Sequence, residues 1–166
     1  MNLTIPAILL LVNFQVAAQT NQTPCSSSEA AQFDFWVGEW DLTWNDTSHG
    51  TNHIEKMYGN CTINEHFADP NTNYLGQSWS VYNPASHEWQ QTWIDNQGGY
   101  IALKGSWQGD RMVLKTPEMQ GPAGKRQMRM VYYNIKPDAF DWSWEASTDG
   151  GISWKPNWKI HYDRKH

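Results

Sequence analysis

Polar and apolar residues alternate along most of the chain, in short runs that are separated by turn residues. Trp, Tyr, Ile and Val recur at every second position of these runs, which is typical of half-buried β-strands. Ten strands are predicted, at residues 39–45, 53–58, 61–67, 74–82, 88–95, 100–107, 111–116, 126–135, 139–147 and 154–162. A short helix is predicted before them, over residues 29–35.

The connections between the predicted strands are short and rich in Gly, Pro, Asn and Asp, as in Asn96-Gln-Gly-Gly99. Such connections cannot hold crossover helices, so neighbouring strands should pair as antiparallel hairpins. A meander of about ten strands has two free edges, and closure into a barrel removes both. The pattern therefore predicts an all-β protein, an antiparallel meander closed into a barrel, with a two-sheet sandwich as the alternative.

Two charged residues fall on strand faces that also carry apolar side chains, namely Glu65 in 61–67 and Arg129 in 126–135. An unpaired charge inside a protein is costly, so each needs a partner or water. We expect an internal pair between Glu65 and Arg129, joined by Asp95 and Gln91. The opposite face of 126–135, with Met128, Met130 and Tyr132, is also fairly apolar.

Eleven tryptophans are an unusual number for 166 residues. Most of them are expected to pack the core, but aromatic walls around a few polar groups also form ligand pockets. The residues expected to line such a pocket are Glu65, Trp79, Gln91, Trp93, Arg129, Tyr133 and Trp144. The main functional hypothesis is a barrel that binds a small hydrophobic or aromatic molecule.

Two further hypotheses remain open. The first is a cofactor-free isomerase, cyclase or hydrolase. In that enzyme Glu65 or Asp95 acts as the general acid or base, and Arg129 or Tyr133 stabilises negative charge. The second is a structural secreted protein without a ligand, in which the internal polar groups form a water-filled network.

The first 18 residues contain no charge and end in Val16-Ala17-Ala18. An apolar run followed by small residues predicts a signal peptide that is cleaved after Ala18, and hence secretion without an integral membrane span. An uncleaved anchor is the alternative, although polar residues interrupt the apolar stretch. Residues 19–32 are expected to form a polar tail, and residues 33–166 a single domain.

Cys25 and Cys61 are the only cysteines, and in an oxidising compartment they are expected to form a disulfide. Two separate thiols are the alternative. Three sequons, at Asn21, Asn45 and Asn60, are candidate glycosylation sites.

The charge distribution offers no basic run, and the formal net charge is −5. Nucleic acid is therefore not an expected partner. The six histidines lack the spacing of a metal site, so neither a metal nor another cofactor is predicted. His161 shares its strand face with lysines and is expected to point to solvent.

Several motifs resemble those of a known family. They are Phe35-Trp-Val-Gly-Glu-Trp-Asp41, Asn60-Cys-Thr-Ile-Asn-Glu65, Ser80-Val-Tyr-Asn-Pro84, Trp89…Trp93-Ile-Asp95 and Ser147-Thr-Asp-Gly-Gly-Ile-Ser-Trp154. In this order they resemble the DUF1579-type family of uncharacterised lipocalin-like proteins, over about residues 33–163. The resemblance implies a calycin-like barrel and no particular reaction.

Within this stretch, the segment Gly38-Glu39-Trp40 resembles the Gly-x-Trp motif at the start of lipocalin barrels. The resemblance implies that Trp40 closes the base of the barrel and is covered by a basic residue from a late strand. Arg164 is the candidate for that residue. The last motif, Ser147 to Trp154, also matches the Asp-box pattern, Ser-x-Asp-x-Gly-x-x-Trp. It occurs once, so a propeller is not expected. Asp149 and the two glycines that follow it predict a hairpin held by local hydrogen bonds.

Overall fold

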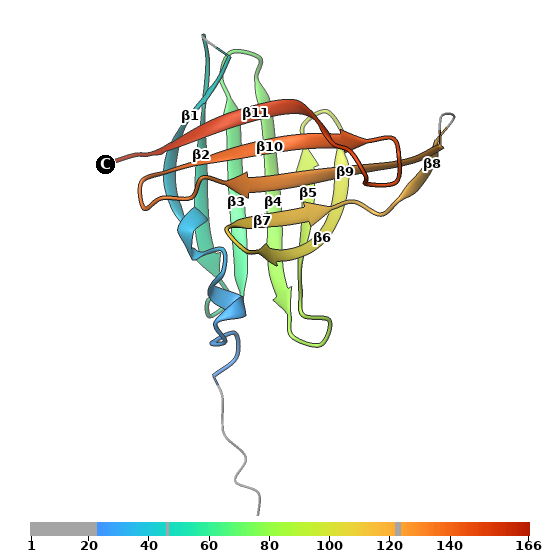
Figure 1. Cartoon of the computed structure of the whole chain (residues 1–166). Helices are drawn as coiled ribbons and strands as arrows, with labels where there is room; N and C mark the ends of the chain where they lie inside the picture. Colours follow the sequence, from blue (N-terminus) through green and yellow to red (C-terminus); the bar gives the residue numbers. More distant parts are fainter. Residues whose placement is uncertain (1–22, 46, 122–123) are drawn as a thin grey trace, which may run out of the picture.

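A computed structural model describes residues 23–45, 47–121 and 124–166 (Figure 1). The predicted signal peptide and Asn21 lie outside these residues. The elements are the 3₁₀ helices η1 (Glu29–Ala31) and η2 (Asp34–Trp36), and the strands β1 (Gly38–Trp44), β2 (Ser48–Met57), β3 (Thr62–Asp69), β4 (Tyr74–Asn83), β5 (Glu88–Asp95), β6 (Tyr100–Gln108), β7 (Arg111–Lys115), β8 (Met119–Gly121), β9 (Gly124–Tyr133), β10 (Ala139–Ser147) and β11 (Lys155–Arg164). Within the described ranges, no helix is long and apolar enough to cross a membrane.

Ten of the strands close into an antiparallel barrel. Successive strands pair from β1 to β7, then β7 pairs with β9, β9 with β10 and β10 with β11. The barrel closes where β11 pairs with β1, with Trp40 opposite Arg164. The short strand β8 lies outside this circuit and pairs only with β9. The predicted closed meander is confirmed, and the sandwich is wrong.

The two halves of the barrel cross at a steep angle, as Figure 1 shows for β3–β5 behind and β9–β11 in front. The hairpins at one end, including β1–β2, β3–β4, β5–β6 and β10–β11, surround its mouth. At the other end lies the base, which the segment before β1 fills.

Phe33, Trp36 and Trp40 fill this base and are fully buried. Phe33 contacts Trp89 and Tyr132 edge-on, with ring centroids 4.8 and 5.2 Å apart. The predicted short helix is present as two separate 3₁₀ turns, because Phe33 between them leaves helical geometry. This segment is therefore a hydrophobic plug.

A disulfide joins Cys25 to Cys61, which are 36 residues apart and whose Cα atoms lie 5.1 Å from each other. The predicted bridge is confirmed. It attaches the plug to the turn between β2 and β3. Two sequon asparagines, Asn45 and Asn60, are exposed in turns and have positive φ angles.

The hairpin between β10 and β11 is organised around Asp149. Its carboxylate accepts hydrogen bonds from the amides of Ile152 and Ser153 and from the hydroxyl of Ser147. The hydroxyl and the amide of Ser153 contribute most to keeping the pKa of Asp149 well below its ordinary value, and the hydroxyl of Ser147 adds to this. Gly150 and Gly151 have φ angles of 73° and 85°, which a residue with a side chain adopts only with strain. The motif therefore has the local structural role that its residues predict.

Candidate functional site

The barrel encloses a cavity of about 130 Å³ between the plug and the mouth. Aromatic side chains form most of its wall, and Glu65 is the only charged residue among the described residues that line it. The lining residues are Glu65, Phe67, Tyr74, Trp93, Ile101, Met130, Tyr132, Trp142, Trp144, Trp158, Ile160 and Tyr162.

Glu65 is held by neutral partners from the two strands beside β3. Ser78 lies directly opposite Glu65 in the β3–β4 register and donates its hydroxyl to Oε2 at 2.5 Å. The amide of Asn52 on β2 donates to Oε1 at 2.7 Å and to the hydroxyl of Tyr162 at 3.2 Å. Both partners are fully buried or nearly so. Glu65 therefore has hydrogen bonds but no counter-ion.

Burial dominates the electrostatics of this carboxyl group. Desolvation raises the pKa of Glu65 to about 7, although the hydrogen bonds from Ser78 and Asn52 act in the opposite direction. Desolvation also raises the pKa of Tyr132 and Tyr162, and the charge of Glu65 adds to both shifts. Around neutral pH the cavity thus contains one carboxyl group that is close to half ionised, beside neutral tyrosines.

The aromatic wall is made of rings that meet edge to face. Trp158 lies 5.7 Å from Trp142 and 5.8 Å from Phe67, measured between ring centroids, with interplanar angles of 89° and 82°. Trp93 approaches Gly76 so closely that a Cβ atom there would lie 2.0 Å from the indole. Gly76 therefore leaves the space into which Trp93 fits.

Four predicted pocket residues do lie on the inside of the barrel. Glu65, Trp93 and Trp144 line the cavity, and Gln91 is buried on the inner face of β5. The amide of Gln91 donates to the hydroxyl of Ser80 at 2.9 Å rather than to Glu65.

The predicted ion pair between Glu65 and Arg129 is wrong. Arg129 lies on the outer face of β9, where it pairs with Glu145 at 2.6 Å and covers the ring of Trp154 at 4.2 Å. Both faces of β9 are apolar, so alternation alone could not decide which one turns inward. The register places Met130 and Tyr132 inside.

Tyr133 and Trp79 are also outside the cavity. Tyr133 shares the outer face of β9 with Arg129, and burial together with the charges of Asp141 and Glu145 raises its pKa. Trp79 is 36% exposed and stacks on Tyr58. On β4 the small serines point inward, since Ser78 bonds to Glu65, and the larger Trp79 points outward.

Asp95 lies at the rim and not beside Glu65. Its carboxylate accepts hydrogen bonds from the Trp93 indole and the Tyr74 hydroxyl, at 3.1 and 2.9 Å, and from the amides of Gln97 and Gly99 in the β5–β6 turn. Desolvation acts to raise the pKa of Asp95, but these hydrogen bonds outweigh it and lower the pKa. Asp95 therefore orients two wall residues rather than serving as an internal base.

The sequence interpretation missed Asn52, Tyr132, Trp142, Trp158 and Tyr162. The alternation of β11 could have indicated Trp158 and Tyr162, which lie with Ile160 on its inner face. Asn52 contacts Glu65 diagonally across the β2–β3 pairing, since its direct partner is Phe67. Only the register reveals such a contact.

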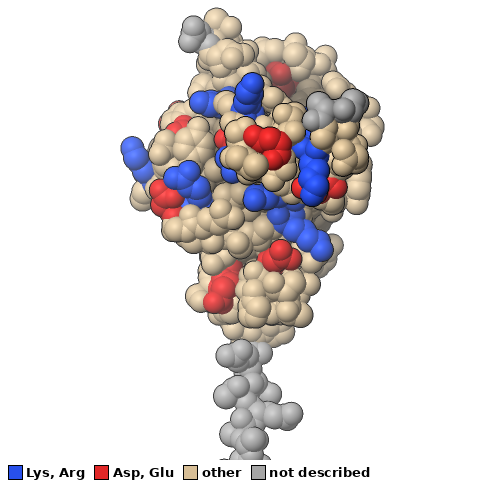
Figure 2. Space-filling view, turned by 45° about the vertical axis from the view of Figure 1, so that its right-hand side comes forward, with Lys and Arg blue, Asp and Glu red and all other residues tan. Residues whose placement is uncertain are grey.

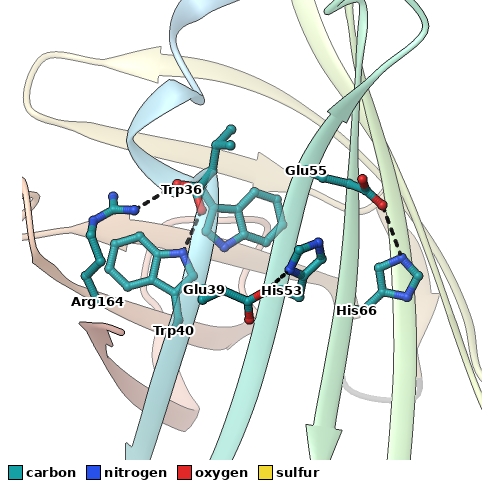
Figure 3. A network of polar contacts seen from close by, with 8 residues as sticks. Trp36, Glu39, Trp40, His53, Glu55, His66 and Arg164 are labelled. Atoms are coloured by element: carbon teal, nitrogen blue, oxygen red, sulfur yellow. Dashed lines mark hydrogen bonds and ion pairs between the residues drawn. The ribbon is translucent and has the colours of Figure 1, made fainter. Parts of the chain in front are cut away.

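At the base, Arg164 covers Trp40 with its guanidinium carbon 4.1 Å from the ring centroid. Its Nη1 donates to the carbonyl oxygen of Val37 at 2.9 Å, and its Nη2 donates to that of Phe35 at 3.1 Å. The indole of Trp40 donates to the carbonyl oxygen of Trp36 (Figure 3). The contact that the lipocalin resemblance implies is therefore present.

The outer surface carries scattered charges. Figure 3 shows Glu39 beside His53 and Glu55 beside His66 on the outside of β1–β3.

Within the described ranges, no group of three or more His, Cys, Asp or Glu residues could hold a metal ion. His161 is about half exposed and contacts Asp141, so it points to solvent as expected. On the face drawn in Figure 2, Lys and Arg are interspersed with Asp and Glu rather than gathered in one patch.

No protein-family model matches the sequence, and no curated protein matches it significantly.

Proposed function

We propose that the protein is a secreted, lipocalin-like barrel that binds one small hydrophobic or aromatic molecule in its interior. The observation that carries this proposal is the carboxyl group of Glu65, buried in the wall of an aromatic cavity without a basic partner. The contact between Trp40 and Arg164, together with the motifs around it, supports the kinship with lipocalins.

The energetics of Glu65 favour a binding role over a structural one. A shift of its pKa from 4.5 to about 7 corresponds to about 3 kcal/mol of lost stability once the group is ionised. A glutamine would accept a hydrogen bond from Ser78 or Asn52 without that loss. A group that reduces stability inside a cavity is a candidate for function, because functional sites retain such groups.

The size of the cavity limits the ligand. An apolar cavity of about 150 Å³ accommodates one benzene-sized ring. The interior of about 130 Å³ therefore suits a molecule of about one ring, with further groups extending toward the mouth.

Secretion is supported by the disulfide, because such bonds persist in oxidising compartments. The predicted leader over residues 1–18 is a second and independent reason. Determination of the amino terminus of the exported protein would test it, and we expect Gln19.

Binding is tested with the purified protein and neutral one-ring compounds, such as indole and phenol. The lining tryptophans should change their fluorescence on binding, and native mass spectrometry should detect a complex with one ligand. Glu65→Gln should alter the affinity, whereas Glu145→Gln, a matched change on the outer face of β10, should not. If no compound binds and no molecule co-purifies from the natural source, the barrel is structural and the proposal is wrong.

A second candidate function is acid–base catalysis by Glu65. Its pKa of about 7 favours this, because a general acid or base works best near the operating pH. Arg129, Tyr133 and Asp95 are not among the described residues that line the cavity, so the hydroxyl groups of Tyr74, Tyr132 and Tyr162 are the remaining partners. The test is turnover by Glu65→Gln, and an unchanged rate would exclude Glu65 as the acid or base.

A further inference from the structure

The cavity combines three features: a carboxyl group, an aromatic wall and the absence of any basic side chain among its described lining residues. Lys, Arg and His all lie elsewhere, and the arginine expected inside pairs with Glu145 on the outer face. The lining therefore combines a carboxylate, once Glu65 is ionised, with aromatic rings, whose faces are electron-rich. We propose that its ligand is a small organic ammonium ion.

This inference rests on the proposed function, and it names the chemical class of the ligand. Cations are attracted to aromatic faces within about 6 Å of the ring centroid, and aromatic cages with a nearby carboxylate recognise ammonium groups. Here the rings come from separate strands, with Phe67 on β3, Trp93 on β5, Trp142 on β10 and Trp158 on β11. These rings line the same cavity as Glu65.

The same arrangement disfavours the binding of neutral apolar ligands and of anions. A neutral apolar ligand would remove the remaining water from Glu65 and leave the ionised carboxylate more poorly solvated. An anionic ligand would be repelled by it. An ammonium ion instead supplies the counter-ion that the fold omits, and an ionised carboxylate accepts further hydrogen bonds beyond those from Asn52 and Ser78.

The affinity for a cation should depend on the ionisation of Glu65. The other titratable groups that face it are the hydroxyl groups of Tyr132, Tyr162 and Tyr74, from β9, β11 and β4. The pKa of each is raised by burial, to about 12 for Tyr74, so these groups stay neutral between pH 5 and 8. Asn52 and Ser78 do not titrate. Only Glu65 changes charge inside the cavity over that range.

The test compares choline with 3,3-dimethylbutan-1-ol, which has the same shape but a carbon atom in place of the charged nitrogen. Binding of each to the full mature chain is measured by calorimetry and tryptophan fluorescence at pH 8. We expect choline to bind at least tenfold more tightly, in the range of one unscreened charge contact. Glu65→Gln should abolish that preference, and the outer-face control Glu145→Gln should retain it.

A measurement on the unaltered protein keeps the test independent of the folding of the variant. Between pH 8 and pH 5.5 protonation of Glu65 should weaken choline binding roughly tenfold or more and leave the alcohol nearly unaffected. Equal affinities for the two probes, or choline binding that does not change with pH, would overturn the ammonium inference while the cavity still binds neutral molecules. If neither probe nor any neutral ring compound binds, both this inference and the proposed function are wrong.

Discussion

The guanidinium group of Arg164 covers the ring of Trp40 and donates to the carbonyl groups of Phe35 and Val37. Residues near the two ends of the described chain are thereby joined at the base of the barrel. Arg164, on β11, thus contacts both β1 and the plug, and it stabilises the base of the barrel where β11 pairs with β1.

Replacing Arg164 by Met should therefore destabilise the protein by about 2–3 kcal/mol, because the charged hydrogen bonds and the cation–π contact are lost together. Urea unfolding followed by tryptophan fluorescence would measure the change. Lys159→Met provides the control, since Lys159 is exposed on the same strand and should change the stability by less than about 0.5 kcal/mol. Equal midpoints for the two variants would contradict the role of Arg164.

The raised pKa of Glu65 predicts how stability depends on pH. The folded state keeps a proton on Glu65 up to a pH of about 7, whereas the unfolded chain releases it near 4.5. The stabilisation is thus complete below pH 4.5 and is lost as the pH rises through 7. Relative to Glu65→Gln, which does not titrate, the wild type should lose about 3 kcal/mol between pH 4.5 and 8. A difference that stays constant across this range would show that the pKa of Glu65 is the same in the folded and unfolded states.

Gly76→Ala should disturb the mouth of the cavity. A Cβ atom at Gly76 would collide with the Trp93 indole, and overpacking of this kind typically costs about 1–3 kcal/mol. We expect reduced stability and a changed indole spectrum, together with weaker binding of ring compounds. Leu75→Ala is the control, because Leu75 is largely exposed and should alter neither property.

Loss of the disulfide should weaken the attachment of the plug. Closure of a 36-residue loop corresponds to about 3–4 kcal/mol in the chain-entropy model. The double variant Cys25→Ser, Cys61→Ser should unfold at correspondingly lower urea concentration than the oxidised protein. Reduction of the wild type should reproduce this shift, and a reduced protein as stable as the oxidised one would contradict the prediction.

Arg129→Met tests the outward orientation of that side chain. The variant loses a partly buried ion pair with Glu145, for which we expect about 1 kcal/mol of destabilisation. Affinity for choline and for ring compounds should stay within twofold of the wild type. A large loss of affinity would place Arg129 at the cavity after all.

The strand pattern predicted the barrel because its signal is local and repeats. On β5 one face is clearly larger and more apolar than the other, so Trp93 could be placed inside the barrel. On β9 the outward Val131 and Tyr133 are as apolar as the inward Met130 and Tyr132. Which face of β9 turns inward is decided by its pairing with β10, and this pairing cannot be read from the sequence.

The polar half of the site was predictable only in part. Glu65 was identified because a charge among apolar neighbours is conspicuous in one strand. Its partners were not identified, because Asn52 and Ser78 reach it through the registers of β2 and β4. The sequence pattern predicted Arg129 as the counter-ion of Glu65. In the structure the carboxyl group of Glu65 instead accepts hydrogen bonds from the neutral side chains of Asn52 and Ser78.

The plug leaves the barrel with a single route to its interior. Because Phe33, Trp36 and Trp40 fill the base, a molecule that binds in the cavity would enter and leave between the hairpins at the mouth. Its residence time is then set by the motions of those hairpins, above all the β5–β6 turn that Asp95 holds in place. Substitutions in that turn would change how long the contents stay without changing how strongly the cavity attracts them.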